Sequence, residues 1–329
     1  MKEFFAGKRV LVTGGTGSIG SEIVRRLLAC GPETVRVFSR DETKQFLLAQ
    51  ELGERPDLRW LIGDVRDPDR LRRAMRRVHF VFHAAAMKHV PACEYNPFEA
   101  VLTNVVGTQN IIHAAIDAGV EKVISVSTDK AVDPSSTMGA TKLLAERIVS
   151  SAYRFVPEVR LATVRFGNVL GSRGSILPLV TSQVEKGGPV TLTSPEMTRF
   201  VMPIEKAAWL VLKACTMAWG GETFILRMPA VRIADLLPVL IEILAPRFGK
   251  DPGAIRIETI GKRAGEKIHE SLLSEEEAER VESHPQMFVV RPVSSETTSR
   301  LAASEYQSGA ATPLAPDEIR TLLAESGLA

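Results

Sequence analysis

The residues of this chain best suited to chemistry lie in the stretch SVSTDKAVDPSSTMGATK, residues 125–142. It places Thr128, Asp129 and Lys130 side by side, directly after a short apolar run. A hydroxyl, a carboxyl and an amine in a row can donate and accept protons, which is general acid–base chemistry. An adjacent Asp and Lys can equally form an exposed ion pair that contributes almost nothing. The position of these residues in the fold therefore decides between the two interpretations.

The chain around this stretch alternates between short apolar runs and helical patterns, as a doubly wound parallel α/β sheet does. Strands are expected over residues 9–13, 34–39, 58–62, 79–85, 122–127 and 159–168. Helices are expected between them, the longest over 97–118 and 137–154. In such sheets the carboxyl ends of the strands face the crevice where ligands bind. Because Thr128, Asp129 and Lys130 follow the fifth strand, their position favours a functional role.

The segment TGGTGSIG, residues 13–20, predicts a dinucleotide-binding site. Its glycines lie between a strand and a helix, where the backbone must turn with positive φ and approach a pyrophosphate closely. The amino terminus of the helix adds amide donors for the phosphates. The expected cofactor-binding residues are Gly14, Thr16, Gly17, Ser18, Ile19, Gly20, Ser39, Arg40, Lys44, Asp64, Val65, Ala84, Ala85, Ala86 and Lys142.

The end of the second strand decides between NADP and NAD. NAD sites usually place a carboxylate there for the ribose 2′-hydroxyl, whereas this chain has Ser39 and Arg40, with Lys44 one helical turn later. A hydroxyl and two cations suit a 2′-phosphate, so NADP is the expected cofactor and NAD the less favoured one. Asp41 lies past the usual position and is expected to cap a helix. Asp64 follows the third strand and suits an adenine contact and a loop cap equally well.

Composition excludes several classes of protein. The 41 Lys and Arg residues nearly balance the 39 Asp and Glu residues, so no nucleic acid and no acidic membrane surface is expected as a partner. Cys30, Cys93 and Cys215 lack paired spacing, which indicates a reducing compartment. No apolar run approaches the roughly 20 residues of a membrane helix, and the first strand starts too early for a signal peptide, so a cytoplasmic location is expected. Histidines and carboxylates do not cluster, so no metal is expected.

One family resemblance covers nearly the whole chain. The segments that carry it are TGGTGSIG, SRDETKQ, GDVRD, HAAAMKHVPACEYNP, TNVVGTQN, STDKAVDP, MGATK, RFGNVLGSRGSILPL, SPEMTRF and KRAGEKIHE. They resemble extended short-chain dehydrogenases/reductases of the UDP-N-acetylglucosamine 4,6-dehydratase family, which serve polysaccharide biosynthesis. The chain is more similar to the short soluble form of this family than to its long members, which carry an amino-terminal membrane region. We expect an NADP-binding Rossmann domain over residues 1–168 and a smaller, partly interleaved α/β substrate domain over residues 169–329, some segments of which return to the first domain.

The resemblance also implies a reaction. Hydride would leave carbon 4 of UDP-N-acetylglucosamine for NADP, water would be lost across carbons 5 and 6, and hydride would return to carbon 6, giving a UDP-4-keto-6-deoxy sugar. Lys130 would be the base at carbon 5 and Asp129 the acid for the 6-hydroxyl. Thr128 would bind the 4-oxygen, and Lys142 the nicotinamide ribose. Whether carbon 5 is inverted stays open. Relatives form dimers and hexamers, so a homo-oligomer is expected.

Met138 departs from the pattern of the wider superfamily, in which a Tyr-x-x-x-Lys pair removes the 4-hydroxyl proton. Methionine cannot accept that proton usefully, so Asp129 or Lys130 is expected to serve twice, through Thr128 or water. By the same resemblance, the expected substrate-binding residues are Lys88, Asn168, Arg199, Arg263 and Glu266. Two other functions stay open: a nucleotide-sugar 4-epimerase, which needs no elimination, and a non-catalytic NADP-binding regulator, which Met138 alone supports.

Overall fold

A large sheet forms the centre of the computed structural model, which describes residues 1–262, 265–292 and 306–327. Among the described residues this sheet has nine strands. Their order is β13 (Val281–Ser283), β14 (Met287–Val290), β10 (Thr223–Leu226), β6 (Arg160–Arg165), β5 (Lys122–Val126), β4 (Phe80–His83), β1 (Arg9–Thr13), β2 (Thr34–Ser39) and β3 (Leu58–Ile62). The strands from β10 to β3 run parallel, whereas β14 is antiparallel to β10 and β13 to β14. The predicted α/β class with a large, mostly parallel sheet is confirmed.

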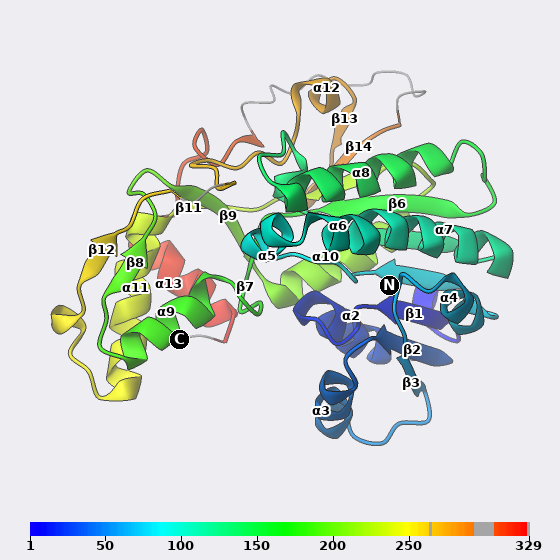
Figure 1. The fold of residues 1–329 in the computed structure, drawn as a ribbon, viewed down its shortest axis with the longest axis horizontal. Helices are drawn as coiled ribbons and strands as arrows, with labels where there is room; N and C mark the ends of the chain where they lie inside the picture. Colours follow the sequence, from blue (N-terminus) through cyan, green and yellow to red (C-terminus); the bar gives the residue numbers. More distant parts are fainter. Residues whose placement is uncertain (263–264, 293–305, 328–329) are drawn as a thin grey trace.

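Helices cover both faces of this sheet (Figure 1). One face packs against α2 (Ser18–Leu28) and α10 (Ile204–Met217), and the other against α4 (Pro68–Met75), α7 (Gly107–Ala118) and α8 (Thr137–Ala152). In α2 the fully buried residues Ile23, Val24 and Leu27 recur at helical spacing. This periodicity determines which side of the helix meets the sheet. Two further helices, α1 (Lys2–Phe5) and α3 (Glu42–Leu52), flank the layers.

The strand order reverses at β1, which lies between β2 and β4. Such a switch point opens a crevice at the carboxyl ends of the strands. The glycine loop follows β1 at this point. Gly14 has a φ of 63°, and a Cβ there would lie 2.6 Å from the backbone nitrogen of Ala85. Glycine therefore allows the loop after β1 to come this close to the loop after β4.

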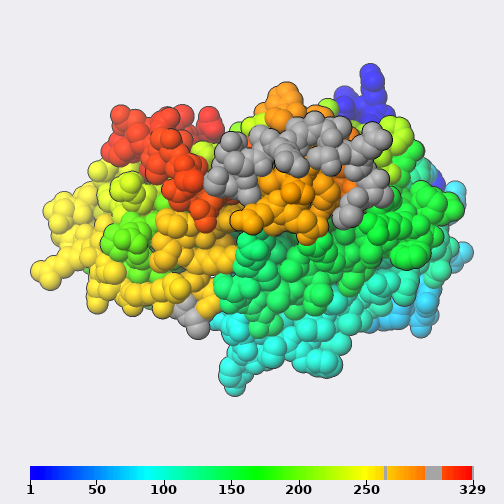
Figure 2. Space-filling model, turned by 90° about the horizontal axis from the view of Figure 1, so that it is seen from above, coloured from blue at the N-terminus to red at the C-terminus, as the bar shows by residue number. Residues whose placement is uncertain are grey.

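The smaller lobe is built mostly from segments that follow β6. It contains β7 (Asn168–Leu170), α9 (Ile176–Glu185), β8 (Val190–Leu192), β9 (Thr198–Pro203), β11 (Ala230–Arg232), α11 (Ile233–Leu244), β12 (Ile257–Thr259) and α13 (Pro316–Glu325). Apolar residues of α9, α11 and α13 share one core, and Figure 2 shows the red carboxyl-terminal residues gathered at the yellow end of the molecule. Because β10, β13 and β14 lie in the large sheet, the chain returns to it after entering the lobe. The division at residue 168 stays a prediction.

The strand predicted over residues 159–168 is interrupted in the structure. It ends at Arg165, and β7 begins at Asn168 in a different sheet. Gly167 lies between them, and a Cβ there would lie 2.8 Å from the Cβ of Phe200. A close approach of two backbones therefore ends the strand, and apolar periodicity does not report such a contact.

The helix predicted over residues 97–118 contains a π-helical turn. This turn (Val101–Val106) separates α6 (Pro97–Ala100) from α7, and α5 (Val90–Tyr95) precedes them. Such turns often mark functional sites. Here the side chain of Asn104 accepts from the backbone nitrogen of Met87 at 2.8 Å and donates to its carbonyl oxygen at 3.0 Å. The turn thus fixes the loop after β4. None of the helices in the described residues combines the length and apolarity that a bilayer crossing requires.

Candidate active site

A cleft of about 700 Å³ lies at the carboxyl ends of the parallel strands from β3 to β6. Its walls include every residue predicted to bind the cofactor, together with Thr128, Lys130 and Met138. The volume is that of a typical ligand site. In the described part of the chain, buried side-chain oxygens of Thr103, Ser127, Asn168 and Ser175, all in these walls, have no hydrogen-bond partner. Buried polar atoms in folded proteins nearly always have partners, so these atoms fit a polar ligand such as a dinucleotide or a sugar.

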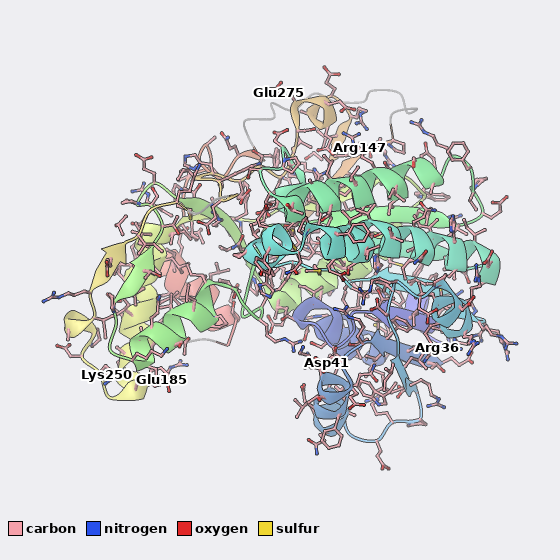
Figure 3. All side chains as sticks on the ribbon, viewed as in Figure 1. Arg36, Asp41, Arg147, Glu185, Lys250 and Glu275 are labelled. Carbon is pink, nitrogen blue, oxygen red and sulfur yellow. The ribbon has the colours of Figure 1, made fainter. Side chains whose placement is uncertain are left out.

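The end of β2 carries the residues predicted to choose between NADP and NAD. Ser39 Oγ lies 2.8 Å from Thr16 Oγ1, and no carboxylate follows Ser39 directly. Arg40 and Lys44 are about half exposed, at 57% and 48%, and pair with Asp64 and Asp41 respectively. Asp41 accepts the backbone N–H of Lys44 at 2.9 Å and caps α3, as predicted. Figure 3 shows Asp41 at this end of α3.

Asp64 caps its loop, which is one of the two roles predicted for it; the other is a contact with adenine. Its Oδ1 accepts the backbone N–H of Arg66 at 3.0 Å, and its Oδ2 accepts from the guanidinium at 2.7 Å. Although burial opposes the shift, the hydrogen bonds from Arg66 hold the pKa of the Asp64 carboxyl below its ordinary value. Asp64 also lines the cleft, so its contact with adenine stays a prediction.

The loop after β7 lines the cleft and contacts the glycine loop through Arg173. The backbone nitrogen of Arg173 donates to Ser18 Oγ at 3.0 Å, and its guanidinium donates to the carbonyl oxygen of Thr16. Lys88 Nζ donates to the carbonyl oxygen of Arg173 at 2.6 Å. Burial, followed by the charge of Arg173, lowers the pKa of Lys88. Sequence reasoning missed Arg173, because a lone arginine in a Gly- and Ser-rich loop has no spacing that marks it.

Thr128, Asp129 and Lys130 lie together directly after β5, as the strand pattern predicted. Asp129 is fully buried behind the other two, and its Oδ1 accepts from Thr128 Oγ1 and from Lys130 Nζ, each at 2.9 Å. Its Oδ2 has no partner in the described residues. Thr128 and Lys130 line the cleft. A buried carboxyl is thus connected to the cleft through a hydroxyl and an amine, an arrangement that can move protons.

Glu270 joins this cluster, and sequence reasoning did not identify it. It is 2% exposed, and its Oε1 lies 3.5 Å from Lys130 Nζ. Burial raises the pKa of Glu270 against the opposing charge of Lys130. Burial alone would lower the pKa of Lys130, but the carboxylates of Asp129 and Glu270 raise it above its ordinary value. Glu270 ends the segment KRAGEKIHE, which carried the family resemblance without indicating a role for this residue.

The predicted substrate-binding residues occupy different places. Lys88 and Asn168 line the cleft. Arg199 is 7% exposed beside the Lys130 cluster, and its guanidinium donates to backbone carbonyl oxygens. Glu266 is not part of the cleft walls, and Arg263 lies outside the described residues. Their roles in substrate binding stay predictions.

Lys142 and Met138 lie one helical turn apart at the start of α8. Lys142 Nζ donates to the carbonyl oxygen of Val126 at 2.7 Å, and burial lowers the pKa of Lys142 to about 8. Met138 is 3% exposed and packs in a small apolar cluster with Cys93 while lining the cleft. A thioether offers no useful proton acceptor there. The position that a tyrosine would occupy is therefore a packing position in this chain.

Comparison with known proteins identifies the family. Residues 10–292 match the model of a family described as polysaccharide biosynthesis protein. The chain belongs to this family, within the extended short-chain dehydrogenases/reductases. It is 59% identical to a Methanocaldococcus jannaschii protein named as an uncharacterized membrane protein, over 89% of this chain and 88% of that one. The Staphylococcus aureus capsular polysaccharide biosynthesis protein CapD is 44% identical over 85% of this chain, which covers 46% of that longer protein.

Two further relatives are named for different reactions. An inverting UDP-N-acetylglucosamine 4,6-dehydratase of Campylobacter jejuni is 40% identical over 88% of this chain and 84% of its own. A UDP-glucose 4-epimerase of Rickettsia rickettsii is 43% identical over 83% of this chain and 80% of its own. Both reactions are therefore represented at about the same similarity.

Solved structures confirm the fold. Pen from Bacillus thuringiensis matches with a TM-score of 0.92 and 43% identity over 98% of both chains. The dTDP-glucose 4,6-dehydratase DesIV of Streptomyces venezuelae, solved with NAD bound, matches with a TM-score of 0.70 and 25% identity over 79% of this chain and 86% of its own.

Proposed function

We propose that this protein is an NADP-dependent nucleotide-sugar 4,6-dehydratase that converts UDP-N-acetylglucosamine to a UDP-4-keto-6-deoxy sugar. The observation that carries the proposal is the hydrogen-bonded pair of Asp129 and Lys130, with Nζ and Oδ1 2.9 Å apart. Lys130 lines the cleft of about 700 Å³, and Asp129 is fully buried. Elimination of water needs a base for carbon 5 and an acid for the 6-hydroxyl, and this pair supplies one group of each kind.

The residues of the cleft have distinct tasks in this reaction. A nicotinamide cofactor held in this cleft would supply the hydride chemistry, oxidation at carbon 4 and reduction at carbon 6. Thr128 Oγ1 hydrogen-bonds the 4-oxygen of the sugar. The 4-hydroxyl proton passes through this hydroxyl to Asp129 Oδ1, which lies 2.9 Å from Thr128 Oγ1. This route replaces the tyrosine that Met138 does not provide. Lys130 then removes the carbon-5 proton of the ketone, and Asp129 protonates the departing 6-hydroxyl. Lys142 would hold the nicotinamide ribose.

NADP is the cofactor that the end of β2 favours. Ser39, Arg40 and Lys44 line the cleft there, without the carboxylate that holds a 2′-hydroxyl in NAD sites. The ion pairs of Arg40 and Lys44 with Asp64 and Asp41 are solvent-exposed and weak, so a 2′-phosphate can replace them. DesIV was solved with NAD, so the choice between the two cofactors depends on these side chains rather than on the shared fold.

Mass spectrometry of UDP-N-acetylglucosamine incubated with the protein and NADP tests the proposal. A dehydratase yields a product lighter by one water, and proton NMR of that product gives the configuration at carbon 5. Lys130→Ala is expected to lower turnover at least ~100-fold, the usual contribution of a general base. Lys250→Ala, at the far end of the smaller lobe (Figure 3), is the matched control and is expected to retain wild-type turnover. Near-normal turnover by Lys130→Ala would refute the assignment.

The second candidate is a nucleotide-sugar 4-epimerase, which the 43% identical Rickettsia relative favours. Epimerisation moves hydride on and off carbon 4 and needs no acid for a leaving hydroxyl. The buried Asp129 would then have no departing 6-hydroxyl to protonate. An isomeric product of unchanged mass would establish the epimerase and exclude the dehydratase.

A further inference from the structure

Glu270 is a buried carboxyl group that the reaction described so far does not use. It is 2% exposed, with Oε1 3.5 Å from Lys130 Nζ and Oε2 without a partner in the residues that the structure describes. Its backbone is fixed, because its N–H donates to Ser308 Oγ at 2.9 Å and its carbonyl oxygen accepts from Ser308 at 2.8 Å. An unsatisfied buried carboxyl oxygen costs stability, so packing alone does not explain this side chain.

The charged groups around Glu270 form one cluster. Lys130, Asp129, Arg199 and Lys267 all act on its carboxyl group. Lys130 is shared, since its Nζ lies 2.9 Å from Asp129 and 3.5 Å from Glu270. One amine therefore contacts two carboxyl groups, and both are nearly inaccessible to solvent.

The proposed reaction requires more proton acceptors than Asp129 alone. In the resting ion pair Lys130 is an ammonium and Asp129 a carboxylate, whereas elimination needs a neutral amine and a protonated acid. Oxidation at carbon 4 sends the 4-hydroxyl proton through Thr128 to Asp129, which then can accept no further proton. Lys130 still carries its own ammonium proton. Lys130 becomes a base only when that proton moves to another acceptor.

We propose that Glu270 is this acceptor: its carboxylate takes the proton of Lys130 Nζ, so that Lys130 can remove the proton of carbon 5. This inference rests on the proposed dehydratase function. Glu270 acts through Lys130 and is therefore a positioning residue rather than a catalytic one. The raised pKa of Glu270 supports this role, because burial makes its protonated form more accessible.

The proton transfers balance over one turnover. An N–H bond of Lys130 breaks and an O–H bond on Glu270 forms. The freed lone pair takes the carbon-5 proton, the electron pair of that bond forms the double bond to carbon 6, and the 6-hydroxyl leaves as water with the proton of Asp129. After carbon 6 has received its hydrogen, Lys130 protonates carbon 5 and regains a proton from Glu270. The cluster ends in its resting state, with no net uptake or release of protons.

Glu270→Gln is the direct test, because glutamine keeps the size of the side chain and cannot take the proton. We expect dehydration at neutral pH to fall at least ~100-fold with KM little changed. Oxidation still proceeds, so the absorbance of the reduced cofactor builds up, and deuterium from solvent no longer enters carbon 5. Since 27% of the Lys130 side chain is exposed, its proton can still escape to water. Turnover by the variant is therefore expected to rise with pH, while wild-type turnover stays nearly flat.

Glu222→Gln is the matched control, because Glu222 is also 2% exposed but accepts from the backbone of Trp219 and Gly220, away from the cluster. It is expected to keep the wild-type pH profile. Glu270→Asp keeps a carboxyl group and is expected to recover part of the lost turnover. A folded Glu270→Gln variant with wild-type turnover, pH profile and deuterium incorporation overturns the proposal.

Two further outcomes are decisive. If circular dichroism shows that Glu270→Gln does not fold, the pH profile of Glu270→Asp replaces it: a displaced profile supports the proposal and an unchanged one overturns it. If the wild-type protein releases no dehydrated product, the proposed function fails and this inference fails with it. Wild-type dehydration together with an unaffected glutamine variant overturns the role of Glu270 alone.

Discussion

Arg165 is buried between two carboxylates, and this cluster offers a quantitative test of what holds the fold together. Its guanidinium donates to both oxygens of Glu277 at 2.7 and 2.8 Å, and to Glu146 at 2.5 Å. Arg165 belongs to β6, Glu146 to α8, and Glu277 to the short helix α12 (Glu275–Ala278). The cluster therefore fastens α12 and α8 to the large sheet. We expect Glu277→Gln to destabilise the protein in a pH-dependent way.

The pKa of Glu277 gives the size of this effect. Burial alone would raise it, but Arg165 and the hydrogen bonds at Ser274 lower the pKa of Glu277 from 4.5 to about 2. Each unit corresponds to about 1.4 kcal/mol, so the ionised carboxylate stabilises the fold by roughly 3 kcal/mol. The folded pKa lies below the unfolded one, so this stability is present above pH 4.5 and is lost as the pH falls toward about 2. The destabilisation by Glu277→Gln should therefore be roughly 3 kcal/mol at neutral pH and about half of that near pH ~3.

Urea denaturation followed by circular dichroism at both pH values measures this difference. Glu276→Gln is the matched control, because the neighbouring side chain is 58% exposed and pairs with Arg147 at 3.5 Å and with Arg280 at 3.0 Å. Figure 3 shows Arg147 on α8 beneath the short helix. Exposed pairs contribute about 0–1 kcal/mol, so this variant is expected to stay close to wild type. Equal losses for the two glutamines, or a loss by Glu277→Gln that does not change with pH, would refute the reasoning.

Two further predictions concern the cofactor and self-association. The double variant Arg40→Ala/Lys44→Ala is expected to weaken NADP binding at least ~10-fold in isothermal titration calorimetry, because two charge-assisted phosphate contacts are lost. NAD binding is expected to change little, and an equal loss of NAD binding would contradict the prediction. Lys250→Ala is the control. Tyr95 and Phe98 are 88% and 70% exposed on α5 and α6, which pack beside α8 (Figure 1), so this surface is expected to join copies of the chain. Phe98→Glu should then yield monomers in light scattering, and a monomeric wild-type protein would contradict the prediction.

The sequence predicted the parallel sheet and the position of the cleft because both depend on local patterns. Short apolar runs form strands, glycines with fixed spacing form the loop after β1, and residues after a strand face the crevice. Thr128, Asp129 and Lys130 were located in this way, and the structure places them at the cleft or directly behind it. The sequence pattern thus predicts the three-dimensional position of those residues that directly follow a strand.

The residues that sequence reasoning missed have positions that depend on distant contacts. Glu270 is notable because it contacts Lys130, and Arg173 because it contacts the glycine loop. Neither belongs to a periodic segment, and a glutamate or arginine in a loop is ordinarily solvated. Gly167 similarly ends β6 because of Phe200. The importance of such residues comes from contacts with residues distant in the sequence. A local sequence pattern therefore does not reveal them.

Arg165 also connects the stability of the fold with the geometry of the proposed proton acceptor. Besides Glu277, its guanidinium donates to the carbonyl oxygen of Leu272 at 2.9 Å, only two residues after Glu270. Arg165 lies on β6, whose neighbour β5 ends just before Asp129 and Lys130. The segment that carries Glu270 is thus hydrogen-bonded to β6, which lies beside β5, the strand that precedes Lys130. The 3.5 Å separation of Lys130 and Glu270 therefore depends on a buried ion pair outside the cleft, and loosening that pair should impair proton transfer before the protein unfolds.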